Sequence, residues 1–360
     1  MSVLTMNPVL RRGRSVLDRR LMPADESEGR LDRLLAAASA AGLDGVLVFG
    51  NAHMPQDLVY FANYMPTTFI GTIVAQPGHP PTLIAGKGGG RDHPYIRTIS
   101  WIDDIRFYPD LGEGVLTIVD AWGLKAPRLG TVGLDTTLPH EMQESVVAAI
   151  PAERRVALDA EVIEMRRTKS ARELLVMRDA TDLAATAAAA AVAAYEGGAS
   201  RREALAAADF AARSQGAEDC RVTAGSRDGI VPLSEVEDKS SAPFSLLVAV
   251  EALGYWGLAT ATSGATASNS TVSDGALDAV VSGLRPGVRV GDVLPRSGDA
   301  EGFVLGGIGC ALGEFPDGEQ DPDAELVEGE VVSIVHWRGG AATVLTSRTM
   351  VLESSGARDL

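Results

Sequence analysis

The chain has 360 residues, a formal net charge of -16 at neutral pH, 46% hydrophobic residues and 22% charged residues. Its length is sufficient for two domains with buried cores, and its composition is typical of a folded globular protein. The strong negative charge argues against a nucleic acid or an anionic membrane as the partner, because phosphate groups would be repelled unless a basic face were segregated.

The cysteine count and the apolar runs bear on cellular location. Cys220 and Cys310 are too few for a disulfide framework and fit a reducing compartment. The longest apolar run, residues 184–195, is too short to span a bilayer. Residues 1–25 are rich in arginine but lack the apolar core of a secretory signal. We therefore expect a cytoplasmic protein whose first 25 residues form an arm or a strap across a partner subunit; an organelle transit peptide is the alternative.

Helix and strand signals alternate in the first half of the chain. Leucine and alanine recur at helical spacing over residues 30–41 and stop at Gly42. A second helix is predicted over residues 139–150. The pattern also predicts strands over residues 45–49, 72–75, 82–85 and 129–134. This alternation indicates a small α/β domain over residues 26–160.

The second half opens with two helix starts of the same type. Ser170 followed by Glu173 forms a capping box, in which each residue satisfies a backbone N–H of the other. Ser200 and Glu203 repeat this spacing, and a third helix is predicted over residues 273–282.

A hairpin is predicted over residues 244–262. Apolar and β-branched residues dominate both sides of Gly254, which is the only turn signal between them. We therefore expect two strands that fold about this glycine.

Three stretches of the second half carry a resemblance to a known family. The sequence MRRTKSARE from Met165 is similar to the linker R-x-x-K-S-x-x-E, Gly254-Tyr255 matches the G-Y of a metal-binding hairpin, and Gly307-Ile-Gly resembles the end of a G-H-G-I-G loop. These motifs resemble the pita-bread family of methionine aminopeptidases, aminopeptidase P, prolidase and creatinase.

The resemblance implies an α+β protein with two domains. A creatinase-like α/β domain would be followed, over residues 161–360, by a pita-bread domain. In that domain two α-β-β units build a curved antiparallel sheet with its helices on the outer face. Resemblance to creatinase and aminopeptidase P also implies a homodimer.

The same resemblance locates five metal-ligand positions, and none of them carries a carboxylate or an imidazole. They fall on Leu247, Leu258, Gly306, Val335 and Ser347. A pair of hard divalent cations needs several carboxylate oxygens. We therefore expect no metal, no other cofactor and no cleavage of Xaa-Pro peptides.

Candidate functional residues must then come from other side chains. Pro232 stands where creatinase, which resemblance implies to work without metal, has its catalytic histidine. His336 is the candidate general acid or base, with a satisfied structural histidine as the competing interpretation. Because side chains alternate along a strand, Val335 should face the former metal cavity, and His336 must be turned inward by an irregularity to join it. Arg221 and Glu314 are the other catalytic candidates.

The remaining candidates would bind the ligand. Arginine can hold a carboxylate through two parallel hydrogen bonds, and an aromatic ring can flank it. These candidates are Trp256, Arg338, Ser347, Arg348 and Arg227. His53 and His93 are further candidates in the first domain, because loops of that domain reach a neighbouring site in dimeric relatives.

The sequence thus leaves three functional hypotheses. The first is a metal-independent protein that acts on or binds a small polar molecule, anionic or amide-bearing, by hydrolysis, elimination or cyclisation. The second is a non-catalytic pseudoenzyme that binds a ligand or a partner. The third is an Xaa-Pro aminopeptidase-like hydrolase, which the loss of the ligands disfavours.

Overall fold

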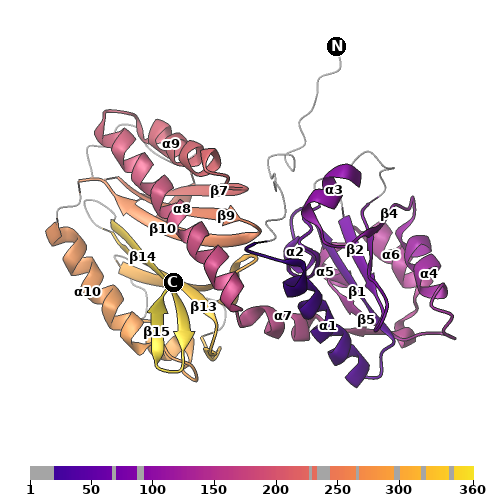
Figure 1. The fold of residues 1–360 in the computed structure, drawn as a ribbon. Coiled ribbons are helices and arrows are strands. Elements are labelled where there is room, and N and C mark those ends of the chain that lie inside the picture. Colours follow the sequence, from indigo (N-terminus) through magenta and orange to yellow (C-terminus); the bar gives the residue numbers. More distant parts are fainter. Residues whose placement is uncertain are drawn as a thin grey trace, which may run out of the picture. The chain divides into compact units, whose positions relative to one another are not determined.

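The computed structural model describes residues 20–66, 70–86, 93–226, 229–232, 244–264, 267–295, 301–317, 322–339 and 344–360. The chain forms two compact units, the first ending at Arg166 and the second beginning at Arg167 (Figure 1). None of the described helices combines the length and the hydropathy needed to span a bilayer.

The first unit is built on a mixed six-stranded sheet with the order β4-β3-β2-β1-β5-β6. β2 pairs antiparallel with β1 and β3, and the other neighbours are parallel. The strands are β1 (Gly45–Asn51), β2 (Ile70–Ala75), β3 (Thr82–Ile84), β4 (Asp104–Arg106), β5 (Leu129–Val132) and β6 (Arg155–Ala157). The α-helices are α1 (Ala24–Ala40), α2 (Gln56–Ala62), α3 (His93–Ile99), α4 (Leu111–Asp120), α5 (Leu134–Thr137), α6 (His140–Ala149) and α7 (Asp159–Arg167), and a 3₁₀ turn, η2, spans Ala152–Arg154.

The structure confirms the strands predicted for this unit. Their side chains are buried on both faces of the sheet. β1 and β2 have almost no exposed residue, as their continuous apolar runs predict. One hydrophobic core joins Leu47 and Phe49 of β1 to Val115 and Val119 of α4 and to Val146 of α6. The first helix begins at Ala24, earlier than the predicted residue 30, after Pro23 in an extended conformation.

The second unit contains two antiparallel sheets. One has the order β10-β9-β7-β8 and the other β12-β11-β13-β14-β15. The strands are β7 (Asp219–Ser226), β8 (Gly229–Pro232), β9 (Ser245–Ala252), β10 (Tyr255–Thr262), β11 (Glu301–Ile308), β12 (Leu312–Asp317), β13 (Val331–Arg338), β14 (Val344–Glu353) and β15 (Gly356–Asp359). The helices are α8 (Ala171–Glu196), α9 (Arg201–Ser214), α10 (Ala267–Gly283) and α11 (Val290–Val293). The antiparallel sheets confirm the predicted α+β class.

Both predicted capping boxes are present. The Ser170 hydroxyl accepts from the Glu173 N–H at 3.2 Å, and the Glu173 carboxylate accepts from the Ser170 N–H at 2.8 Å. Ser200 and Glu203 form the same pair at the start of α9. The third helix is longer than predicted, since it begins at Ala267 rather than at residue 273.

Helix α8 lies directly on β10. Its buried face is a stripe of alanines that includes Ala180, Ala184, Ala187 and Ala191. A Cβ atom at Gly257 of β10 would collide with the backbone of Ala180 and Thr181. Small residues on α8 and on β10 therefore allow the helix and the sheet to pack close together.

Replacing Ser170 by alanine should lower the free energy of unfolding of the second unit by about 1 kcal/mol, because an N–H at the start of α8 loses its acceptor. Urea unfolding followed by circular dichroism measures this change. Ser282→Ala is the matched control, since Ser282 is exposed near the end of α10. Equal losses in the two variants would contradict the importance of the cap.

Candidate functional site

The four-stranded sheet has one side covered by helices. Leu246, Val248 and Val250 of β9 pack into the core beneath α8 and α9, as Figure 1 also shows for the helices. Because side chains alternate along a strand, the intervening residues point to the opposite side. We call this side the inner face of the sheet; its residues are Arg221, Thr223, Leu247, Ala249, Glu251, Trp256, Leu258 and Thr260.

The five-stranded sheet is divided in the same way. Five side chains of this sheet pack against α10 in a hydrophobic core: Phe303, Leu305, Val332, Ile334 and Met350. The alternate residues of β11, β13 and β14 form the inner face of this sheet; they include Val304, Gly306, Ser333, Val335, Ser347 and Thr349.

The five expected metal-ligand positions all lie on these inner faces. Leu247 pairs with Thr260 across β9 and β10, and Val335 pairs with Ser347 across β13 and β14. The hydroxyl groups of Thr260 and Ser347 are hydrogen-bonded at 3.1 Å and join the two sheets. The structure therefore brings four of the five positions to one junction between β10 and β14.

The side chains at this junction do not fit a divalent metal pair. Three of the five positions are aliphatic, one is glycine, and Ser347 offers a single neutral hydroxyl, whereas Mg²⁺, Mn²⁺ and Ca²⁺ prefer several carboxylate oxygens. Among the described residues, no group of three or more His, Cys, Asp and Glu side chains is placed to hold a metal ion.

Arg221 and Trp256, both candidates from the sequence, are brought together on the inner face. The Arg221 guanidinium lies over the Trp256 ring, 4.6 Å from its centroid, a distance at which cation–π attraction operates. Trp256 is buried and its backbone N–H donates to the Gly309 carbonyl at 2.8 Å. The indole therefore offers a fixed platform for the guanidinium.

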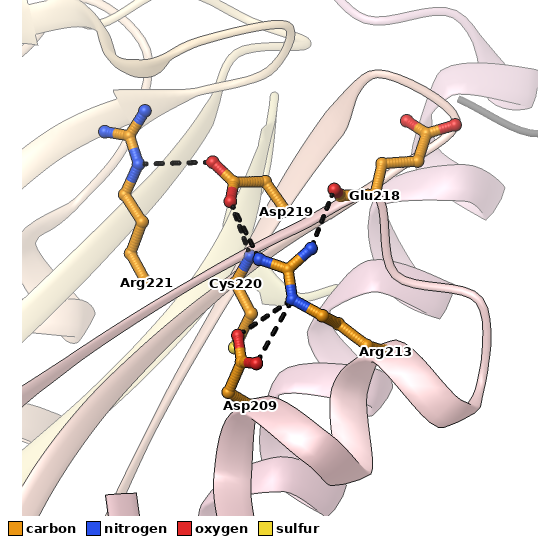
Figure 2. A network of polar contacts seen from close by, with 6 residues as sticks. All are labelled: Asp209, Arg213, Glu218, Asp219, Cys220 and Arg221. Atoms are coloured by element: carbon orange, nitrogen blue, oxygen red, sulfur yellow. Dashed lines mark hydrogen bonds and ion pairs between the residues drawn. The ribbon is translucent and has the colours of Figure 1, made fainter. Parts of the chain in front are cut away.

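A polar network holds the other side of Arg221. Figure 2 shows Asp219 between two arginines: it lies 3.7 Å from Nε of Arg221 and 3.3 Å from a terminal nitrogen of Arg213. Arg213 also pairs with Asp209 at 2.9 Å. The two terminal nitrogens of Arg221 point away from the network, and within the described part of the chain no hydrogen bond engages them. With 52% of its side chain exposed, Arg221 can receive an anion.

The sequence did not reveal this network. Arg213 lies at the end of α9 and Asp219 at the start of β7, so only the fold shows that they meet. The signals available in the sequence were Arg213, a basic residue in the last turn of a helix, and Asp219, an acidic residue at the start of the next strand.

Cys220 lies in the same network but does not supply a nucleophile. Burial, and then the nearby Asp209 carboxylate, raise the pKa of its thiol to about 12. The thiol is therefore protonated at neutral pH and is a poor nucleophile and metal ligand.

The expectation that His336 turns inward is wrong. β13 continues with regular pairing past His336 to Arg338, so no bulge re-aims the ring. The imidazole stacks on Phe303 at 4.3 Å between centroids, fully buried on the α10 side, and its Nε2 lies 2.7 Å from the Glu301 carboxylate. His336 and Val335 thus point to opposite sides of the sheet.

Two of the candidate arginines share the side of His336. Arg348 pairs with Asp278 of α10 at 2.7 Å and with Asp359 of β15 at 2.6 Å. The hydrogen bond to Asp359 raises the pKa of Arg348 above its ordinary value. Arg338, two residues after His336 on β13, has the same direction by alternation. The predicted grouping of these arginines with Ser347 is therefore wrong, because Ser347 lies on the inner face.

Several other candidates lie outside what the structure describes. Arg227 is outside the described residues, and so are the side chains of Glu314 and His93. His53 is exposed after β1, where its N–H donates to the Asn51 side chain at 2.7 Å.

Comparisons with known proteins agree with this architecture. Residues 30–189 match the Creatinase/Prolidase N-terminal domain. These residues therefore form a creatinase/prolidase-type N-terminal domain. A prolidase from Pyrococcus horikoshii is 18% identical with a TM-score of 0.69, covering 92% of this chain and 97% of its own. No match is found among curated protein sequences.

Two further solved structures share the fold of this chain. An X-Pro aminopeptidase from Thermotoga maritima is 17% identical with a TM-score of 0.75, over 91% of this chain and 96% of its own. A histidine-to-alanine variant of Escherichia coli aminopeptidase P is 13% identical with a TM-score of 0.71, over 93% and 94%. At these identities the likeness concerns the pita-bread fold, which confirms the resemblance seen in the sequence.

Replacing His336 by alanine should destabilise the protein by about 2–5 kcal/mol, because it empties a fully buried ring site next to Phe303. Urea unfolding measures the loss. His140→Ala is the matched control, since the His140 side chain is 81% exposed on α6 and should change stability by less than about 0.5 kcal/mol. Unchanged stability of the His336 variant would contradict a structural role.

Proposed function

We propose that this protein is a metal-independent member of the creatinase/prolidase family that binds a small anionic molecule on the inner face of its second unit. The observation that carries the proposal is the junction of β10 and β14. There, the positions where the resemblance puts metal ligands converge, and they carry aliphatic and hydroxyl side chains.

The anionic character of the ligand follows from Arg221. The guanidinium is held on one edge by Asp219 and on one face by Trp256, so little side-chain freedom is lost when a ligand binds. Its other edge is the one that forms paired hydrogen bonds with a carboxylate. Arg221 would therefore bind the charged end of the ligand, a role that carboxylates and metal ions have in a metal-dependent site.

The inner face favours binding over turnover. A general acid or base must lie within hydrogen-bond reach of the reacting proton, and His336 lies on the other side of β13. Glu251 is on the inner face but is only 2% exposed. Asp219, the carboxylate beside Arg221, is paired with two arginines and is better suited to holding Arg221 in place than to moving protons. The non-catalytic hypothesis is thus the form of the proposal that these residues support.

The similarity to prolidases and X-Pro aminopeptidases raises the competing possibility of peptide hydrolysis. We expect the purified protein to carry no stoichiometric divalent metal and to leave Xaa-Pro dipeptides uncleaved with added Mn²⁺ or Co²⁺, because the five positions lack carboxylates. Elemental analysis and a ninhydrin assay measure both. About one metal per chain, removed by a chelator together with peptidase activity, would establish the hydrolase instead.

Arg221→Gln should weaken the binding of small carboxylates by about tenfold or more, since a hydrogen bond to a charged group contributes about 1.5–3 kcal/mol. Isothermal titration calorimetry with a set of small carboxylates measures the change. Arg358→Gln is the matched control, because Arg358 is 55% exposed and pairs with a carboxylate, Glu353, at 2.6 Å. Equal affinities of the wild type and the Arg221 variant would overturn the proposed site.

A further inference from the structure

The first unit contains a pocket of about 360 Å³, a size within the range of small-molecule sites. One wall is helix α1, and the other is formed by residues 79–81 and 101–104, which lead into β3 and β4. We propose that this pocket binds a small organic cation, an ammonium or guanidinium group on a compact apolar body. The proposal goes beyond the function proposed above and is independent of it, because the pocket is lined by residues of the first unit.

Three carboxylates of the pocket are available to a cationic ligand. Glu28 and Asp32 are exposed on α1, and their i, i+4 spacing makes them neighbours on one face of the helix. Within the part of the chain that the structure describes, no hydrogen bond or ion pair engages either of them. Asp103 is exposed on the other wall, 3.9 Å from a terminal nitrogen of Arg97, and so long and exposed a pair contributes little. Both walls therefore present negative charge to the pocket.

A fourth carboxylate, Asp104, is held in place by protein groups. It accepts hydrogen bonds from Nε and Nη2 of Arg106 at 3.0 and 2.8 Å, and from the Thr82 hydroxyl at 2.7 Å. The hydrogen bond from Arg106 lowers the pKa of Asp104, so this carboxylate is charged at neutral pH. Because Arg106 balances that charge, Asp104 is a fixed part of the wall rather than a partner of the ligand.

The same pocket has aromatic and aliphatic surface that solvent reaches. Trp101 is half-buried, and its indole N–H donates to the Phe61 carbonyl at 2.9 Å, which fixes the ring. Pro80 is exposed and Pro81 is half-buried on the same wall. A cation over an indole face is attracted by the charge distribution of the ring, and an apolar body gains free energy when it covers ring carbons. The pocket therefore suits a ligand that joins a cation to a small apolar group.

Organic cations fit this combination of groups better than metal ions or anions do. A divalent metal ion needs several oxygens that converge on one point at about 2.0–2.6 Å, and among the described residues no three acidic, histidine or cysteine side chains converge in this way. Separated carboxylates can still attract the charge of a larger cation, because Coulomb attraction acts over several ångströms. A carboxylate or phosphate ligand would instead be repelled by Glu28, Asp32 and Asp103.

The test uses three probes with the same butyl body: butylamine, butylguanidine and 1-butanol. Their binding to the full chain is measured by ligand-observed NMR at about 0.05 M and at about 0.5 M salt. Both cations should bind about tenfold more tightly than the alcohol, since hydrogen bonds to charged groups are the stronger ones, and they should compete for one site. Their affinity should fall at the higher salt concentration, because the carboxylates of the pocket are exposed.

Two pairs of variants locate the site. The double variant Glu28→Gln/Asp32→Asn should weaken both cations by about tenfold or more. Its matched control is Asp120→Asn/Glu141→Gln, which removes the same charge from exposed positions of α4 and α6 outside the pocket. Trp101→Leu should weaken both cations by about two- to fivefold, whereas Trp101→Phe keeps an aromatic ring and should retain most of the affinity. Urea midpoints confirm that each variant is folded.

Three outcomes would overturn the proposal. If 1-butanol binds as tightly as butylamine, the carboxylates do not recognise the ligand. If the double variant at Glu28 and Asp32 and its control lose affinity equally, the cations respond only to the net charge of -16. If neither cation binds to the folded wild type, the pocket is not a cation site. Failure of small carboxylates to bind at Arg221, by contrast, bears only on the function proposed above.

Discussion

The second unit depends on the close contact of α8 with β10. At Gly257 the backbone of the helix occupies the space that a Cβ atom would fill, and the facing helix surface is made of alanines. Tight interiors respond to even one added methylene group. The residues on the helix-covered side of the sheet can therefore change little. Because side chains alternate along a strand, this also determines which residues point to the inner face.

The inner face is under a different constraint. Leu247, Leu258 and Val335 are not part of the cores beneath α8, α9 and α10, so they can occupy metal-ligand positions without disturbing the packing that holds the sheets in place. The hydroxyl pair of Thr260 and Ser347 still connects the two sheets. A pita-bread fold can thus be retained while the chemistry of its inner face changes, since fold and function are carried by opposite sides of the same strands.

Much of the fold could be predicted because its signals are local. The capping boxes at Ser170 and Ser200 and the turn at Gly254 each depend on a few neighbouring residues, and each occurs as expected. The site was less accessible. Strand alternation alone places His336 outward, and the glycines after Arg338 were wrongly expected to override it. The contacts of Arg221 with Asp219 and Trp256 depend on strand register and on Arg213 of α9, which no local pattern specifies.

The polar network beside Arg221 has a practical consequence for the chemistry of the thiols. Because the pKa of Cys220 is raised to about 12, whereas a thiol in an unfolded chain has a pKa near 8.5, the native protein presents very little thiolate at neutral pH. Cys310 is buried. Cys220, which is partly exposed, should therefore be alkylated slowly for want of thiolate, whereas alkylation of Cys310 requires the second unit to open locally, so its rate reports local stability.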